Sequence, residues 1–208
     1  MAALIYGPSR VIVPEITTTT CLGAELKSWL GDVAQLRIQV FRDFPYLYDG
    51  SLDYERQYLQ TYVESDSAIC VLAFDGDKVV GAATGLAMRD EEAAFRQPLI
   101  EAGIDVDEVF YCAESVLLPA YRGRGIYRQF FAEREAQARR LGLNRVVFCA
   151  VDRPNDHPLK PADYQPLDAI WLRYGYQLLP DVKARFPWQD VDADRETEKT
   201  LSFYHKSL

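Results

Sequence analysis

A short arginine–glycine loop between a strand and a helix is the feature that most constrains this chain. An apolar run ends at Pro119, two residues form a turn, and Arg-Gly-Arg-Gly (122–125) leads directly into a polar helix that ends at Gly142. Gly123 and Gly125 permit backbone conformations and close approaches that a Cβ would block. The first turn of a helix has free N–H donors and the positive end of the dipole. We therefore predict that this loop holds phosphate oxygens.

The distribution of charge favours one defined anionic ligand. The 208-residue chain has a formal net charge of −8, yet seven arginines and only two glutamates fall between Arg122 and Arg145. An acidic surface repels phosphodiester backbones, so this balance disfavours generic nucleic-acid binding. Two nucleotide-binding motifs are also excluded. The dinucleotide fingerprint GxGxxG would need glycine at Arg128, and no segment matches the P-loop GxxxxGK[ST].

The segment LLPAYRGRGIYRQFF (117–131) resembles the acyl-CoA-binding motif of the GNAT N-acetyltransferase superfamily. In the family pattern Arg/Gln-Xaa-Xaa-Gly-Xaa-Gly/Ala, Arg122 takes the first position and Gly125 the fourth. Tyr127 stands at the sixth position, where the family has glycine or alanine. The resemblance covers about residues 24–178, including Trp-Leu-Arg-Tyr-Gly-Tyr (171–176), which is similar to the family's Tyr-Xaa-Xaa-Xaa-Gly-Phe.

The resemblance implies an α/β (mixed α+β) fold with a GNAT-like central mixed, mostly antiparallel sheet flanked by helices. Residues 1–208 would form a single acyl-CoA N-acyltransferase domain. It would move an acetyl or other short acyl group from acyl-CoA to a primary amine of a small molecule or peptide, with acetyl-CoA as cosubstrate and no metal. The alternative is a non-catalytic acyl-CoA-binding sensor or interaction module of the same fold. A homodimer is compatible with either function.

The resemblance also assigns the donor-binding residues. The strand before the loop would hold the acyl group, and the Leu117 N–H would bind the acyl carbonyl as an oxyanion donor. The expected acyl-CoA-binding residues are Val116, Leu117, Leu118, Arg122, Gly123, Arg124, Gly125, Ile126 and Tyr127.

Glu114 is the leading candidate for the base that accepts the proton of the incoming amine. It lies on the same strand in an otherwise apolar run, where desolvation would raise its pKa. An ion pair between Glu114 and a nearby arginine is an equally weighted alternative. The family often uses a tyrosine as general acid, but Trp171 occupies that position here. Tyr174 is therefore the expected acid, with Tyr164 and Tyr176 as alternatives, unless the thiolate leaves unaided. Trp171 and Tyr174 are three apart on a short helix, and core packing is the commoner role for such a pair.

Other residues are weaker candidates. His157 lies in a proline-rich loop and ranks below Glu114, because a lone loop histidine is more often solvated surface. Cys149 falls in an apolar strand and is expected to be a buried thiol rather than a nucleophile. An aromatic cluster either lines the acceptor pocket or packs under a turn; its members are Phe41, Phe44, Tyr46 and Tyr48, with Asp49 beside them.

Periodicity independently predicts a mixed sheet in an α/β or α+β domain. The expected helices are 24–41, 53–65, 122–141 and 167–175, with a helical excursion at 90–104. The expected strands are 67–74, 78–88, 108–118, 145–151 and 201–208, and residues 152–166 are irregular. The segment 176–200 has no assigned structure.

The four cysteines are distant in sequence, contain no CxxC pair and predict buried free thiols without a zinc site. No apolar run approaches the roughly 18–20 residues of a membrane span. The first fifteen residues lack a basic segment followed by an apolar one, so no signal peptide is expected. We therefore expect a cytoplasmic protein without a membrane association.

Overall fold

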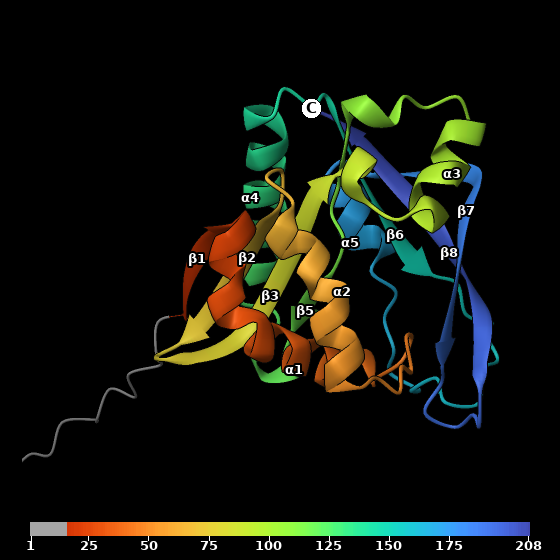
Figure 1. The fold of residues 1–208 in the computed structure, drawn as a ribbon. Helices are drawn as coiled ribbons and strands as arrows, with labels where there is room; N and C mark the ends of the chain where they lie inside the picture. The colour runs from red at the N-terminus through yellow and green to blue at the C-terminus, as the bar shows by residue number, and fades with distance from the viewer. Residues whose placement is uncertain (1–15) are drawn as a thin grey trace, which may run out of the picture.

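The computed structural model describes residues 16–208, which form an eight-stranded sheet with helices on both faces (Figure 1). Only β4 and β6 pair in parallel, so the predicted mixed, mostly antiparallel sheet is confirmed. The sheet order is β1-β2-β3-β4-β6-β8-β7, and β5 pairs with β3. The strands are β1 (Ile16–Leu22), β2 (Ile69–Asp75), β3 (Lys78–Ala87), β4 (Val109–Tyr111), β5 (Ser115–Leu117), β6 (Arg145–Val151), β7 (Gln177–Gln189) and β8 (Glu196–Ser207). The signal-peptide prediction concerns residues 1–15, which lie outside the described part of the chain.

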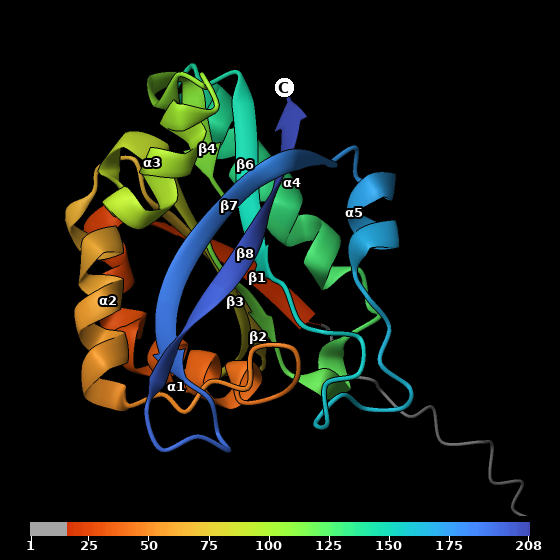
Figure 2. The ribbon, with the colours of Figure 1, turned by 90° about the vertical axis from the view of Figure 1, so that its right-hand side faces the viewer.

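The helices pack on the sheet in two groups. Figure 2 shows α1, α2 and α3 on one side of the sheet and α4 and α5 on the other. Each group buries an apolar stripe, such as Val33 and Leu36 of α1 or Phe130 and Phe131 of α4. The α-helices are α1 (Leu30–Phe41), α2 (Leu52–Glu64), α3 (Ala93–Glu101), α4 (Ile126–Arg140) and α5 (Asp168–Arg173). Within residues 16–208, no helix is both long and apolar enough to cross a membrane.

The predicted strand 108–118 is in fact two strands, and this break shapes the site. β4 pairs with β6, and the last bond between them runs from the Cys112 N–H to the Val147 carbonyl at 2.8 Å. Beyond this point β5 pairs with β3, while β6 continues along β8, with which it pairs over its whole length. The sheet therefore splits after Cys112, and among residues 16–208 the facing edges of β5 and of the end of β6 have no strand partner.

Two predicted helices begin later than expected. The segment 24–41 starts as a 3-10 helix (Gly23–Trp29), and α1 begins only at Leu30. The helix predicted at 122–141 begins at Ile126, because Gly125 has a φ of +84° and ends the loop. The four cysteines are buried and unpaired, as predicted.

Two strands were not predicted: β1 and β7. β7 is long and curved and forms an extended pair with β8 (Figure 2). From Val182 to Trp188, buried or partly buried side chains alternate with exposed ones, a strand pattern that the sequence prediction missed. Pro180 and Pro187 lie within the strand and count against it in sequence, since proline cannot donate to a ladder. β7 is the last strand of the sheet, where such residues are tolerated.

Candidate functional site

The arginine–glycine loop (residues 122–125) presents free backbone donors at the start of α4. Gly123 and Gly125 have φ angles of +76° and +84°, a region that favours glycine, and a Cβ at either position would meet open space. The first helical bonds run from the Arg128 and Gln129 N–H groups to the Gly125 carbonyl, at 3.1 and 3.3 Å. The N–H groups of Ile126 and of residues just before it precede this ladder and remain available to an anion.

Of the seven arginines in the basic segment, three surround this loop. Arg122, Arg124 and Arg128 are exposed there. Arg122 Nε donates to the Leu117 carbonyl at 3.2 Å, which holds its side chain along the end of β5. Arg134, by contrast, is buried in the core and donates to backbone carbonyls, so part of the local positive charge is structural.

The register of β5 on β3 determines where each backbone group points. Leu118 N–H donates to the Val80 carbonyl at 3.0 Å, and Thr84 N–H donates to the Glu114 carbonyl at 3.1 Å. Because N–H groups alternate between the two edges of a strand, the Leu117 N–H points to the opposite edge, where the sheet is split. A thioester carbonyl could approach this donor, whereas the Leu118 N–H is already used.

Arg134 fixes the backbone at the split. Its Nη1 donates to the carbonyls of Thr84 and Glu114, at 3.2 and 3.0 Å, and its Nη2 donates to the Ser115 Oγ at 2.8 Å. Both carbonyls also accept a backbone N–H, that of Thr84 from Ala113 and that of Glu114 from Thr84, so Arg134 is a second donor to each. Its bonds hold the irregular backbone that places the Glu114 side chain.

Glu114 lines a cavity of about 100 Å³ at the point where the strands separate. One wall comes from α1 and α2 with the loop between them, another from β7, and the floor from β4, β6 and their continuations. We call it the aromatic cavity, because nine of its fourteen lining residues are aromatic: Phe41, Tyr46, Tyr48, Tyr54, Tyr58, Phe95, Tyr111, Phe186 and Trp188, together with Arg37, Ala113, Glu114, Cys149 and Leu201.

Glu114 shares one buried cation with a second carboxylate. Arg37 Nη1 lies 2.7 Å from Glu114 Oε2, and Arg37 Nε donates to Glu55. All three side chains are buried, so two carboxylates and one guanidinium leave a formal charge of −1 beside the cavity. Glu114 Oε1 is buried and has no hydrogen-bond partner among residues 16–208. This oxygen is free to accept a bond from a ligand. The ion pair that sequence reasoning weighed for Glu114 is present, and its partner is Arg37.

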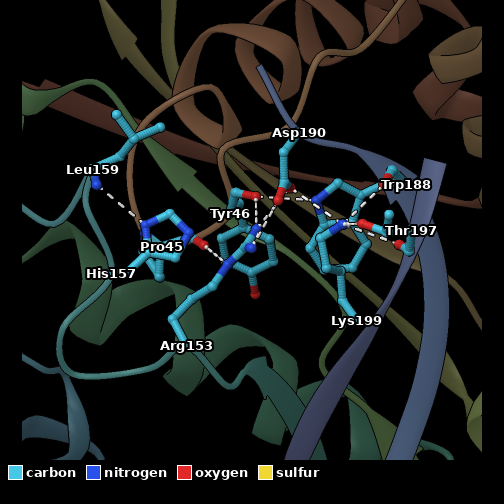
Figure 3. A network of polar contacts seen from close by, with 9 residues as sticks. All are labelled: Pro45, Tyr46, Arg153, His157, Leu159, Trp188, Asp190, Thr197 and Lys199. Carbon is cyan, nitrogen blue, oxygen red and sulfur yellow. Dashed lines mark hydrogen bonds and ion pairs between the residues drawn. The ribbon is translucent and has the colours of Figure 1, made fainter. Parts of the chain in front are cut away.

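A polar network anchors two walls of the aromatic cavity to each other (Figure 3). Arg153 donates to the carbonyls of Pro45 and Tyr46, both at 2.7 Å, and forms a bidentate pair with Asp190 at 2.8 Å. The Trp188 indole N–H donates to the Tyr46 carbonyl at 3.0 Å. Burial by itself would raise the pKa of Asp190, but the bonds from Arg153 and the charge of Lys199 hold it below its ordinary value. The network thus positions Tyr46 and Trp188.

A family profile described as "Acetyltransferase (GNAT) family" matches residues 34–160, more than half of the chain. The chain belongs to the GNAT acetyltransferase family. Its matched region contains the arginine–glycine loop, the split strands and Glu114. No curated protein matches the chain in sequence.

Solved structures of this family share the fold at low sequence identity. yncA of Salmonella typhimurium, solved with its cofactor acetyl-CoA, is 14% identical, with a TM-score of 0.55 and coverage of 92% of this chain and 94% of that chain. A ribosomal-protein-alanine N-acetyltransferase of Brucella melitensis is 15% identical (TM-score 0.58; 92% and 99% covered). A polyamine N-acetyltransferase of Drosophila melanogaster is 12% identical (TM-score 0.56; 93% and 100% covered). These similarities confirm the GNAT fold.

Tyr174 lies beside the start of α4. Its ring packs on Tyr127 and Phe131, with centroids 6.3 and 5.5 Å apart, and it is half-buried. The Trp171 indole N–H donates to the Tyr127 hydroxyl at 2.9 Å, so the residue at the family's tyrosine position contacts the residue at the sixth motif position. Tyr176, in contrast, is fully buried and donates to Glu135 at 3.1 Å, away from the loop.

The structure divides the predicted aromatic cluster. Phe41, Tyr46 and Tyr48 line the aromatic cavity, as the acceptor-pocket hypothesis required. Phe44 instead packs on His157 and Tyr164 of the proline-rich loop. The exposed Asp49 pairs with Arg42 at 2.9 Å and takes no part in the cavity, because its helix-linking loop turns it outward.

Two further features define the chemistry of the cavity. Burial raises the pKa of the Cys149 thiol to about 12, which keeps it neutral and argues against a nucleophilic role. Among residues 16–208, no group of three or more His, Cys, Asp or Glu side chains is placed to hold a metal ion.

Sequence reasoning missed the buried charges Arg37 and Glu55 and the aromatic wall from β7. A signal for the charges was present: Arg37 follows Val33 at helical spacing, and Glu55 precedes Leu59 and Tyr62 in the same way. A charged residue within an apolar stripe is almost never fully buried unless it is paired. Two such residues on consecutive helices therefore indicate a buried pair.

Proposed function

We propose that this protein is an acetyl-CoA-dependent N-acetyltransferase that acylates a primary amine. The observation that carries the proposal is the order of groups along residues 114–125, with Glu114 just before β5. Glu114 lies at the aromatic cavity, the Leu117 N–H faces the split edge, and the arginine–glycine loop follows directly. An amine bound in the cavity and an acyl-CoA bound along β5 would meet between Glu114 and Leu117.

Each part of an acyl-CoA has a fitting partner in this proposal. The thioester supplies an activated acyl group. Arg122, Arg124 and the N–H groups of Gly123, Gly125, Ile126 and Tyr127 would hold the pyrophosphate, while Val116 and Leu118 would support the strand against which the pantetheine lies. The free donors and exposed arginines of the loop support this assignment.

The chemical step needs a base, an oxyanion donor and an acid. Glu114 would take the ammonium proton, so that the amine nitrogen attacks the thioester carbonyl carbon. The Leu117 N–H would stabilise the oxyanion that forms, before the C–S bond breaks. Tyr174 would donate a proton to the departing thiolate and would regain one from the nitrogen, which loses its second proton as the amide forms. The formal charge of −1 shared by Glu114, Glu55 and Arg37 favours a cationic acceptor.

Release of free thiol in the presence of primary amines tests this function. Wild-type protein should release thiol above the hydrolysis background, and Glu114→Gln should lower kcat by about 10²–10⁴-fold while acetyl-CoA still raises the melting temperature. Glu101→Gln, on the exposed side of α3, serves as a control and should retain activity. Wild-type turnover and an unchanged pH profile in Glu114→Gln would remove Glu114 as the base.

The second candidate is an acyl-CoA-binding module without catalysis. It is favoured by Trp171, whose indole N–H engages Tyr127 and which has no acidic proton to give. Stabilisation by acetyl-CoA without thiol release across a broad amine panel would establish this alternative.

A further inference from the structure

A chain of buried hydrogen bonds runs from Glu114 away from the aromatic cavity. Tyr58 Oη donates to Glu114 Oε2 at 3.4 Å and lies 2.9 Å from Tyr62 Oη. Tyr62 Oη lies 3.1 Å from Glu91 Oε2. Glu114, Tyr62 and Glu91 are 5%, 0% and 4% exposed, so the chain is closed to bulk water over most of its length. Acetyl transfer as described above does not use Tyr62 or Glu91.

The chain has room for one proton more than its two hydroxyls supply. Three contacts join the four side chains, and each needs one hydrogen between its oxygens. Burial raises the pKa of Tyr58 and of Tyr62 well above the ordinary value, so each keeps its single proton. At rest both carboxyl groups can be ionised, and a third hydrogen, once taken up, would reside on a carboxyl group, either Glu114 or Glu91.

The surroundings of the two carboxyl groups decide where an added proton rests. Glu114 forms an ion pair with Arg37 at 2.7 Å, whereas Glu91 forms no ion pair among residues 16–208. Burial raises the pKa of Glu91 to about 7, against the opposing effect of bonds from the Glu92 N–H and Tyr62. The titratable groups that influence Glu91 are Glu92 in its own segment, Tyr58 and Tyr62 of α2, Tyr111 of β4, Glu114 beside β5 and Cys149 of β6.

We propose that Tyr58 and Tyr62 form a proton relay that carries the proton taken up by Glu114 to the carboxylate of Glu91. This inference rests on the proposed function. When Glu114 is protonated by the amine, it donates to Tyr58, Tyr58 donates to Tyr62, and Tyr62 donates to Glu91. Transfer moves one hydrogen across each of the three contacts and leaves Glu91 protonated. Each hydrogen bond of the chain then runs in the opposite direction, from Glu91 toward Glu114. Both end states hold three hydrogens for three bonds, so no co-reactant is needed.

The relay solves a problem that the cavity creates. A base that faces a bound amine and an acyl donor would keep its proton within the closed site. Glu91 lies immediately before the exposed Glu92 at the start of α3, so a proton delivered there is one residue from solvent. Glu91 must be ionised to receive it, and turnover should therefore rise with pH through about 7, the pKa of Glu91.

The pH dependence of kcat in Glu91→Gln and Tyr62→Phe tests the relay. Both variants should lose the rise near pH 7 and show about tenfold lower kcat above it, with unchanged stabilisation by acetyl-CoA. The control is Tyr176→Phe, which removes another fully buried tyrosine–carboxylate bond outside the site and should stay within twofold of wild type. Full activity and a wild-type pH profile in Glu91→Gln would overturn the relay. If Glu114→Gln nevertheless abolishes turnover, the proposed function stands without it.

An infrared measurement tests the relay without turnover. The difference spectrum between wild type and Glu91→Gln at pH 6 should contain the C=O stretch of a protonated carboxyl group. This band should shift in Tyr62→Phe, which removes its partner, and not in Tyr176→Phe. A wild-type protein without the band at pH 6 would overturn the relay even if no acceptor amine has been found, while leaving the proposed acetyl transfer unaffected.

Discussion

The arginine–glycine loop and the aromatic cavity differ in how the chain builds them. The loop is four consecutive residues whose shape comes from two glycines and the helix that follows. The cavity gathers side chains from Arg37 to Leu201, on α1, α2, α3, β4, β6, β7, β8 and the segments between them. A local site of this kind tolerates changes elsewhere, whereas an assembled site depends on distant contacts. Mutations should therefore be able to impair either site without impairing the other.

The largest expected effect is on the assembled site. Arg153→Met would leave Asp190 buried with only Lys199 at 3.4 Å, and should lower the free energy of unfolding by about 3–5 kcal/mol. At a temperature where the variant is folded, we expect a higher KM for the amine and an unchanged affinity for acetyl-CoA. Urea unfolding and steady-state kinetics measure both. Arg185→Met, which breaks an exposed pair with Glu198, should cost below about 1 kcal/mol. Equal losses in the two variants would contradict a positioning role for Arg153.

A second test uses the titration of Glu91 behind the cavity. Its pKa is about 7 in the folded protein against an ordinary value of 4.5, so the folded state binds more protons between these values. The contribution of Glu91 to the free energy of unfolding should therefore be greatest below about pH 4.5. It should fall as the pH rises through 7, by up to about 3 kcal/mol. Urea unfolding of wild type and Glu91→Gln across pH 5–8 measures the difference. Parallel curves for the two proteins would show that Glu91 titrates normally.

A third test changes the arginine–glycine loop and leaves the aromatic cavity unaltered. Gly125→Trp would place a large side chain at a φ of +84° in the proposed phosphate site, and should weaken acetyl-CoA binding by about 100-fold, or 2.7 kcal/mol. Gly103 has a similar φ of +75° in open space outside both sites, so Gly103→Trp carries a comparable backbone strain. Calorimetric titration with acetyl-CoA should separate the two variants. Unaltered affinity in Gly125→Trp would mean that the loop does not bind CoA.

The smallest expected effect concerns the proposed acid. Tyr174→Phe should lower kcat less than about tenfold, because a thiolate is a good leaving group near neutral pH. Its KM values should remain those of the wild type, since the ring still packs on Tyr127 and Phe131. Steady-state rates above and below pH 8 measure this change. A loss as large as that of Glu114→Gln would instead make Tyr174 essential to the chemistry.

The predictions from sequence succeeded where a signal is local. The hairpin of β2 and β3, the strand β6, the irregular segment 152–166 and the helix that follows the loop all have such signals. The interruption between β4 and β5 was missed, because Val109–Leu118 is almost uniformly apolar and a continuous strand fits that pattern equally well. Only the end of the β4–β6 pairing at Tyr111 and the irregular residues 112–114 make the break visible.

By itself, the sequence determined the loop, the class of fold and the segment that carries Glu114 and Leu117, although Glu114 lies just before β5 rather than in a strand. Glycine spacing, helix dipoles and hydrophobic periodicity act over a few residues, so they can be read in order along the chain. Only the tertiary structure decided that Arg37 pairs with Glu114, that Trp188 faces Tyr46, and that Tyr58 and Tyr62 connect Glu114 to Glu91. These contacts join residues far apart in sequence, and their geometry depends on how the helices and the curved β7 pack against the split sheet.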